Sequence, residues 1–243
     1  MTLALNKTGT LYVVATPMGN LEDITFRAVK ILETVDIIAA EDTRHSKKLL
    51  NHYNIQARLI SCHEHNEVQK TNSLIKYLKD GLNIALISDA GTPTISDPGY
   101  RLINRIAQEN LPIIPIPGCC AAITGLCVSG LPADTFHFAG FLPKKNQKLQ
   151  QALESLQHES STLIFYESPR RIQTLVETAL NIFGDRSACL AREITKLHEE
   201  YLRGKLSEIL KCLNEKDRQY SAAVDFLLNQ QDDHPLEGSS LVK

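Results

Sequence analysis

Residues 84–99 read IALISDAGTPTISDPG, and the fold is most easily derived from this segment. Its first four residues form an apolar run without polar alternation, which is typical of a strand covered on both faces. The next twelve residues include two each of Gly, Pro, Asp, Ser and Thr. Such a composition lets the backbone approach a ligand closely and present its N–H groups. The segment therefore predicts a buried strand that ends in a ligand-binding loop.

Strand-like and helix-like patterns alternate on both sides of this segment, which predicts an α/β fold with a mostly parallel sheet in the first half. The further strand patterns of that half lie at 11–14, 36–40, 58–60 and 113–116. The second half predicts another α/β layer of mixed strand direction. We place an N-terminal α/β domain at residues 9–117 and a C-terminal α/β domain at 118–218. Residues 219–243 are expected to form a divergent, partly disordered tail.

The composition excludes several classes of protein. The chain has 243 residues, 26 of them basic and 28 acidic, so bulk charge alone does not attract nucleic acid. No run approaches ~18 apolar residues, so no membrane span is expected. A secretory signal is not expected, and the six cysteines form no Cys-x-x-Cys pair. These features predict a cytoplasmic protein with reduced thiols.

Four polar or Gly/Pro-rich loops follow predicted strands of the first half. They cover residues 16–20, 41–45, 88–99 and 117–122. Ligands of open α/β sheets bind beyond the carboxyl ends of the strands. Any one of these loops could be an ordinary turn, with Asp89 or Asp97 in an Asx turn. Taken together, the four loops predict a shared pocket.

Other chemistries lack their motifs. Gly-x-Gly-x-x-Gly is absent, so a dinucleotide site of that type is not expected. Residues 62–65 read CHEH, but no third and fourth ligand is evident, and we expect no metal site. A Gly-x-Ser-x-Gly nucleophile elbow is also absent. In the second half, LIFYESPRR at 163–171 and AREITK at 191–196 form either surface salt bridges or a cationic rim for an anionic substrate.

Seven segments of the chain resemble one known family. They read TPMGNLEDITFRA, AAEDTRHSKKLL, HEHNE, SDAGTPTISDPGY, PIPGCCAAITGL, LIFYESPRR and AREITKLHEE. Together they resemble the ribosomal RNA small subunit methyltransferase I family of the tetrapyrrole methylase superfamily, from about Leu11 to about Leu206. The resemblance implies two α/β domains with S-adenosylmethionine in the cleft between them. It also implies methylation of the ribose 2′-hydroxyl of a cytidine in the decoding region of small-subunit (16S) ribosomal RNA.

The resemblance also implies roles for particular residues. The cofactor-binding positions are Pro17, Gly19, Ser88, Asp89, Ala90, Gly91, Pro117, Gly118, Ala121, Ala122, Tyr166 and Glu167. A carboxylate or histidine near the methyl group would help to remove the hydroxyl proton, and the candidates are Asp42, His45 and Asp97. Alternatively, no protein group acts as the base and water takes the proton. Arg44 is expected on the RNA side of the catalytic pocket. The predicted RNA phosphate contacts are Arg44, Lys144, Lys145, Lys148, Arg170, Arg171 and Lys196.

The near-neutral charge favours recognition of an assembled 30S subunit by shape over recognition of free RNA. A homodimer is implied by the resemblance alone. Two alternatives stay open: a porphyrin-ring C-methyltransferase, and an inactive homologue that binds cofactor and RNA. The chain departs from the family after Arg218, where the usual Gly-Glu and apolar strand are missing. Either Ala222–Leu228 replaces that strand, or the last domain is incomplete.

Overall fold

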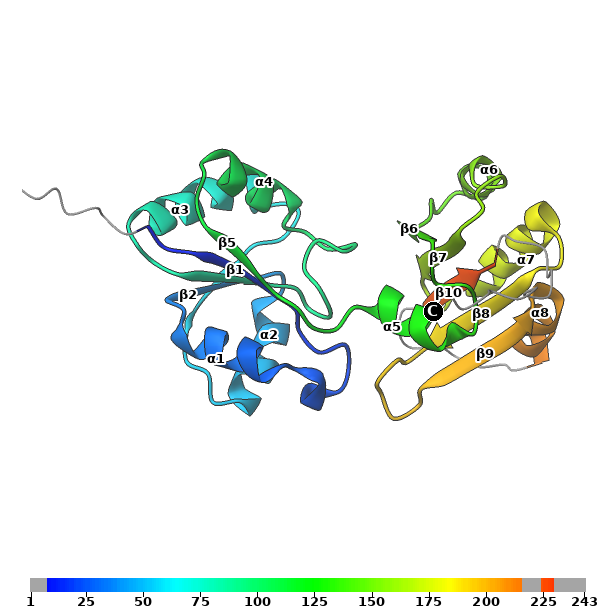
Figure 1. The fold of residues 1–243 in the computed structure, drawn as a ribbon, viewed down its shortest axis with the longest axis horizontal. Helices are drawn as coiled ribbons and strands as arrows, with labels where there is room; N and C mark the ends of the chain where they lie inside the picture. The colour runs from blue at the N-terminus through cyan, green and yellow to red at the C-terminus, as the bar shows by residue number, and fades with distance from the viewer. Residues whose placement is uncertain (1–7, 216–223, 230–243) are drawn as a thin grey trace, which may run out of the picture. The chain divides into compact units, whose positions relative to one another are not determined.

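The computed structural model describes residues 8–215 and 224–229. The chain divides into two compact units, Met1–Cys120 and Ala121–Lys243, so the division falls three residues after the boundary we placed at Pro117. Each unit is built on a five-stranded sheet (Figure 1). Among the helices in the described residues, none is long and apolar enough to cross a membrane.

The first unit contains an all-parallel sheet with the strand order β3-β2-β4-β1-β5. The strands are β1 (Leu11–Val14), β2 (Ile37–Ala40), β3 (Arg58–Ser61), β4 (Ile84–Ile87) and β5 (Ile113–Ile116). The connecting helices are η1 (Leu21–Asp23), α1 (Phe26–Thr34), α2 (Thr43–His52), α3 (Glu67–Lys79) and α4 (Tyr100–Gln108). The predicted parallel sheet is confirmed.

Strand β4 is covered on both faces, as its apolar run predicted. Ile84 and Leu86 belong to a core that includes Leu74 of α3 and Leu102 of α4. The alternate residues of β4 lie in a second core that includes Leu32 of α1. Two layers of helices thus exclude water from the centre of the sheet, and only its edges remain for a ligand.

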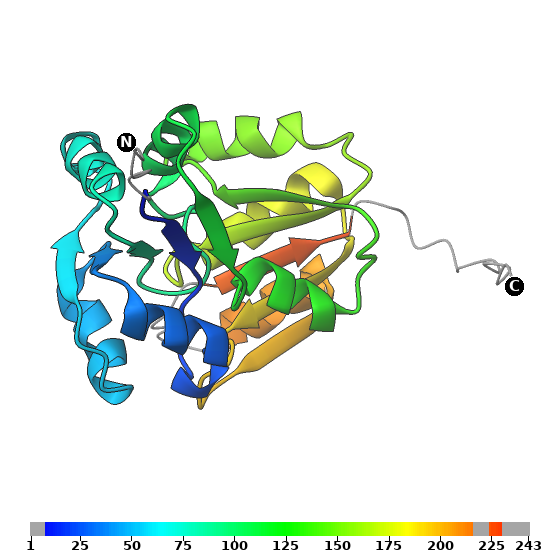
Figure 2. The same cartoon turned by 60° about the vertical axis from the view of Figure 1, so that its left-hand side comes forward.

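The second unit contains a mixed sheet with the order β6-β7-β10-β8-β9. Its strands are β6 (Phe136–Phe141), β7 (Thr162–Glu167), β8 (Ser187–Arg192), β9 (Glu200–Lys205) and β10 (Val224–Leu228). Strand β6 is parallel to β7, and the other neighbouring pairs are antiparallel. The helices are α5 (Ala121–Ser129), α6 (Asn146–Ser155), α7 (Ile172–Phe183) and α8 (Leu206–Glu215). Helices α6, α7 and α8 cover one face, and α5 packs on the other (Figure 2).

Strand β10 completes this sheet at its centre. It pairs with β7 on one side and β8 on the other, and all five of its residues are buried. The structure thus answers the question raised by the missing Gly-Glu strand, because residues 224–228 take the central position. The second unit therefore extends beyond residue 218, where we had ended the domain. The rest of the predicted disordered tail, at 219–223 and 230–243, lies outside the described residues.

One polar side chain interrupts the apolar strand β10. Asp225 is only 4% exposed, and its Oδ2 has no hydrogen-bond partner in the described part of the chain. It lies on the α5 face of the sheet, where a Cβ on Gly125 would be 3.4 Å from that oxygen. Burial raises the pKa of the Asp225 carboxyl group to about 7.

Candidate active site at the carboxyl edge of the parallel sheet

The loops after β1 and β4 are joined by backbone and side-chain hydrogen bonds. The N–H groups of Thr16 and Gly91 donate to each other's carbonyl oxygens, at 2.9 and 3.0 Å. The hydroxyl group of Thr16 also donates to the carbonyl oxygen of Ser88 at 3.1 Å. Thr16 is buried, so these bonds are shielded from water. The two loops therefore form one small, rigid structure beyond the sheet.

The loop at 88–99 also holds the two remaining loops. The N–H group of Asp42, after β2, donates to Oδ1 of Asp89 at 3.0 Å. The hydroxyl group of Thr92 donates to the carbonyl oxygen of Cys119, after β5, at 2.8 Å. All four loops that the sequence analysis singled out are thus bonded together at one edge of the first sheet.

The backbone of this loop cluster is unusually constrained. Thr94 and Ser96 have φ values of 73° and 64°, a region that costs energy for residues with a Cβ. Gly91 has a φ of 82°, for which glycine is suited. Gly118 lies so close to the end of β1 that a Cβ there would be 3.0 Å from the Cβ of Ala15. Such close backbone approach and stored strain are typical of ligand-binding loops.

A cluster of carboxyl groups lies within these loops. Burial and the Glu41 charge raise the pKa of Asp97 to about 6, against a hydrogen bond from Ser88 that lowers it. Burial and the Asp89 charge likewise raise the pKa of Glu41. Since the charges of Glu41 and Asp89 raise the pKa of Asp97, and the charge of Asp89 raises that of Glu41, the three acids share one electrostatic environment. Perturbed carboxyl groups in a loop cluster of this kind are candidates for proton transfer.

Asp42 is occupied by a structural task. Its side chain caps α2 by accepting a hydrogen bond from the N–H of Arg44 at 2.8 Å, and Nη2 of Arg44 lies 3.2 Å from its Oδ2. The side-chain hydrogen bond from Arg44 is the main cause that lowers the pKa of Asp42. The side chain of Arg44 is 90% exposed, and His45 is also exposed on α2. Of the three candidate proton acceptors, Asp97 is the one whose pKa is raised by burial and by a neighbouring charge.

His63 lies close enough to the carboxyl cluster to lower the pKa of Glu41, and it is not among the predicted site residues. It lies in the turn after β3, and its ring lies 6.0 Å from that of His65. Nε2 of His63 contacts the side-chain amide of Asn66 at 3.1 Å, while Nδ1 is buried and has no partner among the described atoms. The CHEH motif could have indicated this residue. No group of three potential metal ligands occurs in residues 8–215 and 224–229.

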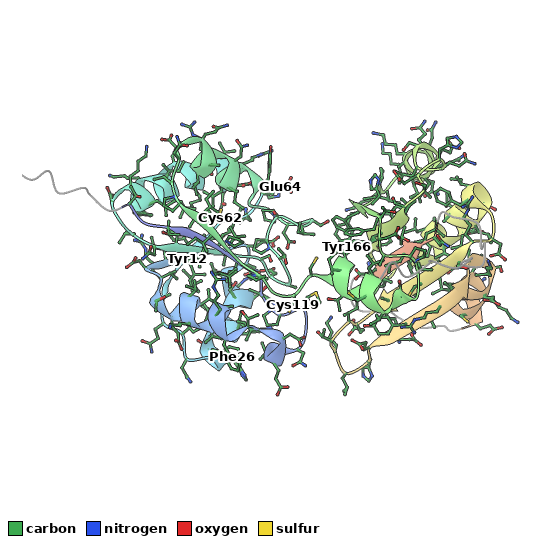
Figure 3. The ribbon with its side chains drawn as sticks, viewed as in Figure 1. Tyr12, Phe26, Cys62, Glu64, Cys119 and Tyr166 are labelled. Atoms are coloured by element: carbon green, nitrogen blue, oxygen red, sulfur yellow. The ribbon has the colours of Figure 1, made fainter. Side chains whose placement is uncertain are left out.

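In the second unit, Tyr166 and Ala122 contact each other. The N–H group of Ala122, next to Ala121 at the start of α5, donates to the phenol oxygen of Tyr166 at 3.0 Å. The ring of Tyr166, which is labelled in Figure 3, packs edge-on against Phe138 and Phe141. The ring centroids are 4.9 and 5.6 Å away, respectively. Two of the predicted cofactor-binding positions are thus neighbours on the face that α5 covers.

Glu167 and Arg171 form an internal ion pair. Glu167 is 1% exposed and accepts a hydrogen bond from the N–H of Ser168 at 2.7 Å. Nη1 of Arg171 lies 3.2 Å from its Oε2, and Nη2 donates to the carbonyl oxygen of Pro143 at 2.8 Å. This placement favours the structural role of Arg171 over the RNA contact that we predicted.

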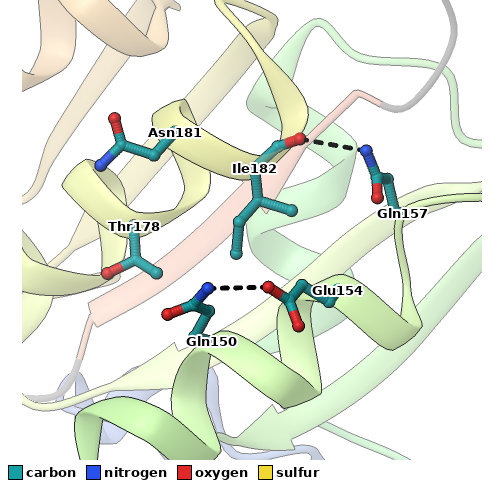
Figure 4. Close-up of a pocket in the computed structure, with 6 residues that line it drawn as sticks. All are labelled: Gln150, Glu154, Gln157, Thr178, Asn181 and Ile182. Carbon is teal, nitrogen blue, oxygen red and sulfur yellow. Dashed lines mark hydrogen bonds between the residues drawn. The ribbon is translucent and has the colours of Figure 1, made fainter.

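The other predicted RNA contacts divide into two groups. Lys196 is partly buried and lies 3.5 Å from Glu193, so it also fits the salt-bridge interpretation. The exposed cations are Lys144, Lys145, Lys148 and Arg170. The second unit also has a groove of about 500 Å³ between α6 and α7 (Figure 4). It is lined mainly by amide and hydroxyl side chains and contains none of the predicted site residues.

Comparisons with known proteins identify the family. A profile described as Tetrapyrrole (Corrin/Porphyrin) Methylases matches residues 10–210. Ribosomal RNA small subunit methyltransferase I of Halalkalibacterium halodurans is 53% identical over 200 residues, which are 82% of this chain and 69% of the relative. The protein of the same name from Escherichia coli O157:H7 is 44% identical over 237 residues, 96% of this chain and 83% of the relative. The chain belongs to the ribosomal RNA small subunit methyltransferase I family.

The match to the Tetrapyrrole (Corrin/Porphyrin) Methylases profile, at residues 10–210, contains all four bonded loops. The fold agrees with more distant solved structures. Uroporphyrin-III-C-methyltransferase from Thermus thermophilus has a TM-score of 0.64 and 20% identity, and covers 91% of this chain and 94% of its own. Diphthine synthase has a TM-score of 0.69 and 12% identity, with 91% and 90% covered. At these identities the likeness shows the tetrapyrrole methylase fold alone, which confirms the predicted fold class.

Proposed function

We propose that this chain transfers a methyl group from S-adenosylmethionine to the ribose 2′-hydroxyl of a cytidine in the decoding region of 16S ribosomal RNA. The observation that carries the proposal is the identity of 44–53% to proteins named ribosomal RNA small subunit methyltransferase I. The bonded loops and the carboxyl cluster support a catalytic role for the first unit, because they combine close backbone approach with perturbed carboxyl groups.

The loops of the first unit fit a cationic, adenosine-containing cofactor. Pro17, Gly19, Ser88–Gly91, Pro117 and Gly118 would hold it mainly through backbone groups, and Gly19, Ala90 and Gly118 are exposed. The carboxyl groups of Glu41, Asp89 and Asp97 would favour the positive sulfonium. When bound, S-adenosylmethionine supplies an activated methyl group. The cofactor roles of Ala121, Ala122, Tyr166 and Glu167 stay predictions.

Asp97 is the residue that we assign to the proton of the ribose hydroxyl. A carboxylate with a raised pKa is a stronger base than an ordinary aspartate and is still ionised at neutral pH. The hydroxyl group of Ser88, which donates to the carbonyl oxygen of Gly91 at 3.1 Å, also lowers the pKa of Asp97 and so favours its ionised form. Asp42 keeps α2 capped and Arg44 extended into solvent, where the guanidinium group can meet the RNA backbone.

The partner is small-subunit ribosomal RNA, presented as an assembled 30S subunit in the cytoplasm. A homodimer is proposed from the family alone, and sedimentation in solution tests it. A mass near twice 27.1 kDa is expected, and a concentration-independent monomer would refute it.

The two alternatives receive less support. A porphyrin C-methyltransferase is not favoured, because the likeness to the uroporphyrin enzyme is 20% identity, against 44–53% to the ribosomal RNA enzymes. An inactive homologue was considered because the last domain could have been incomplete. Strand β10 removes that reason, since it fills the centre of the second sheet.

Methyl transfer in a purified system tests the proposal. The chain is mixed with 30S subunits that lack this methylation and with S-adenosylmethionine that carries a labelled methyl group. Label in a 2′-O-methylcytidine of the 16S RNA is expected, with less label on free 16S RNA. Cofactor binding without any transfer would favour the inactive homologue instead.

A further inference from the structure

Helix α2 has a stripe of basic and polar side chains that begins next to the candidate active site. Arg44, Lys47, Lys48, Asn51 and His52 have the spacing i, i+3, i+4, i+7 and i+8, so they share one face of the helix. All five are exposed, whereas Ser46, Leu49 and Leu50 are the buried residues of α2. We call these five exposed residues the α2 stripe.

The sequence around the stripe is unusually free of acidic residues. Residues 43–63 contain Arg44, Lys47, Lys48 and Arg58 but no Asp or Glu, in a chain whose net charge is −2. No carboxylate in the described residues lies within ion-pair distance of Lys47 or Lys48. Arg44 pairs with the capping residue Asp42 alone and stays 90% exposed. The stripe is therefore a local positive patch on a near-neutral protein.

The charges of the stripe work against the stability of the helix. Arg44 is in the first turn of α2, where the helix dipole disfavours cations, and that turn has no acidic residue. Like charges at i, i+3 and i, i+4 also repel each other. Two cations of this unit outside the stripe, Lys79 and Arg105, do pair with Glu109. Exposed lysines without a carboxylate partner in the described residues, such as Lys47 and Lys48, are available to a polyanionic ligand.

The position of the stripe links it to the active site. The backbone N–H of Asp42, the residue that caps α2, donates to Asp89 in the carboxyl cluster. From Arg44 to His52 the helix advances by ~12 Å. The stripe thus starts beside the proposed site of methyl transfer and leads away from it.

We propose that the α2 stripe binds the phosphate backbone of the ribosomal RNA next to the methylated nucleotide. The inference rests on the proposed function for its substrate. Lysine ammonium groups contact phosphates as point charges, so the stripe would position the RNA without reading its sequence. Lys47 and Lys48 are therefore substrate-positioning residues, and they act together with Arg44.

The double variant Lys47→Ala/Lys48→Ala tests this proposal. The matched control is Lys76→Ala/Lys79→Ala, which removes the same charge from the end of α3. Affinity for 30S subunits is measured over a range of salt concentrations. The α2 variant is expected to bind about tenfold more weakly near 0.1 M salt, and its log–log salt slope is expected to be smaller by about 1.4–1.8. The loss should appear in KM for the subunit, with binding of S-adenosylmethionine unchanged.

Several results would overturn the proposal. One is a salt slope for the α2 variant equal to that of the wild type, and another is an equal loss in the α3 control. A change of oligomeric state without a change in RNA affinity would assign the stripe to a second copy of the chain. The binding measurement does not depend on turnover, so an inactive wild type that still binds subunits through α2 would contradict only the proposed function.

Discussion

Asp97 and Asp225 both carry carboxyl groups whose pKa is raised by burial, but their surroundings differ. Asp97 lies among other acids and next to Ser88, in loops that are bonded together at a sheet edge. Asp225 lies in a closed apolar layer below α5. The environment of Asp97 fits proton transfer, whereas the buried carboxyl group of Asp225 affects stability alone.

We predict that Asp97→Asn lowers kcat for methyl transfer by ~10²–10⁴-fold, because the proton acceptor is lost. In the wild type only the ionised carboxylate accepts a proton, so kcat should fall as the pH drops below about 6. Single-turnover transfer to 30S subunits at several pH values measures both effects. Asp80→Asn, at the exposed end of α3, is the control. Full activity of Asp97→Asn with normal cofactor binding would show that Asp97 is not the base.

We predict that Asp225→Asn is more stable than the wild type at pH 8 but not at pH 5. The folded pKa of about 7 exceeds the unfolded value of 3.8, so the folded state holds the proton more tightly. The free energy of unfolding therefore falls as the pH rises from about 4 to about 7, by up to about 4 kcal/mol. Urea unfolding at both pH values tests this, with the exposed Asp134→Asn as control. An equal effect of Asp225→Asn at both pH values would disprove the buried charge.

The sequence could name the candidate acids but could not rank them. Asp42, His45 and Asp97 all follow predicted strands, and the choice depends on which side chain caps a helix and which is buried. His63 belongs to the CHEH motif, for which no metal site was predicted because further ligands are not evident in the sequence. Its buried Nδ1 depends on the turn after β3, which periodicity does not reveal.

Among the elements, strand β10 was the hardest to predict. Its sequence, VDFLL, places an acid inside an apolar run, and the segment before it lacks the usual Gly-Glu. By contrast, β4 and β5 have continuous apolar runs and lie where they were expected. Helix α7 begins at Ile172, because residues 168–171 form a turn next to the buried Glu167.

Phe226→Ala should destabilise the second unit by about 3–5 kcal/mol, because Phe226 is fully buried at the centre of the sheet and stacks on Phe165. Phe26→Ala removes the same side chain from a position that is 98% exposed on α1, and little change is expected there. Chemical denaturation followed by a probe in the second unit compares the two. If both substitutions cost the same, β10 does not complete the core.

In the loop after β5, Gly118→Val should weaken the binding of S-adenosylmethionine at least about tenfold, because even a Cβ would crowd Ala15 and shift the loop. Calorimetric titration of the folded variant measures the affinity, and circular dichroism checks the fold. Unchanged affinity in a folded Gly118→Val protein would show that S-adenosylmethionine does not bind against this turn.

For the whole molecule, the fold could be predicted from the alternation of strand-like and helix-like patterns. The substrate class could be predicted only from the motifs that resemble a known family. The same fold occurs in a uroporphyrin-III-C-methyltransferase and in a diphthine synthase, so architecture does not select the substrate. Net charge was also a poor guide. The net charge of the whole chain is −2, although residues 43–63 contain no acidic residue. The exposed cations of α2 lie on one face of the helix, which begins next to the carboxyl cluster.

The proposed function of this protein is the methylation of one ribose hydroxyl of small-subunit RNA. The most direct measurement maps 2′-O-methyl groups along the 16S RNA of cells that lack the protein, with the wild-type chain or Asp97→Asn restored. We predict that one cytidine in the decoding region carries the methyl group with the wild type, and that it is unmodified in the other two cases. The same 2′-O-methyl pattern with and without the protein would show that this protein does not methylate the 16S RNA.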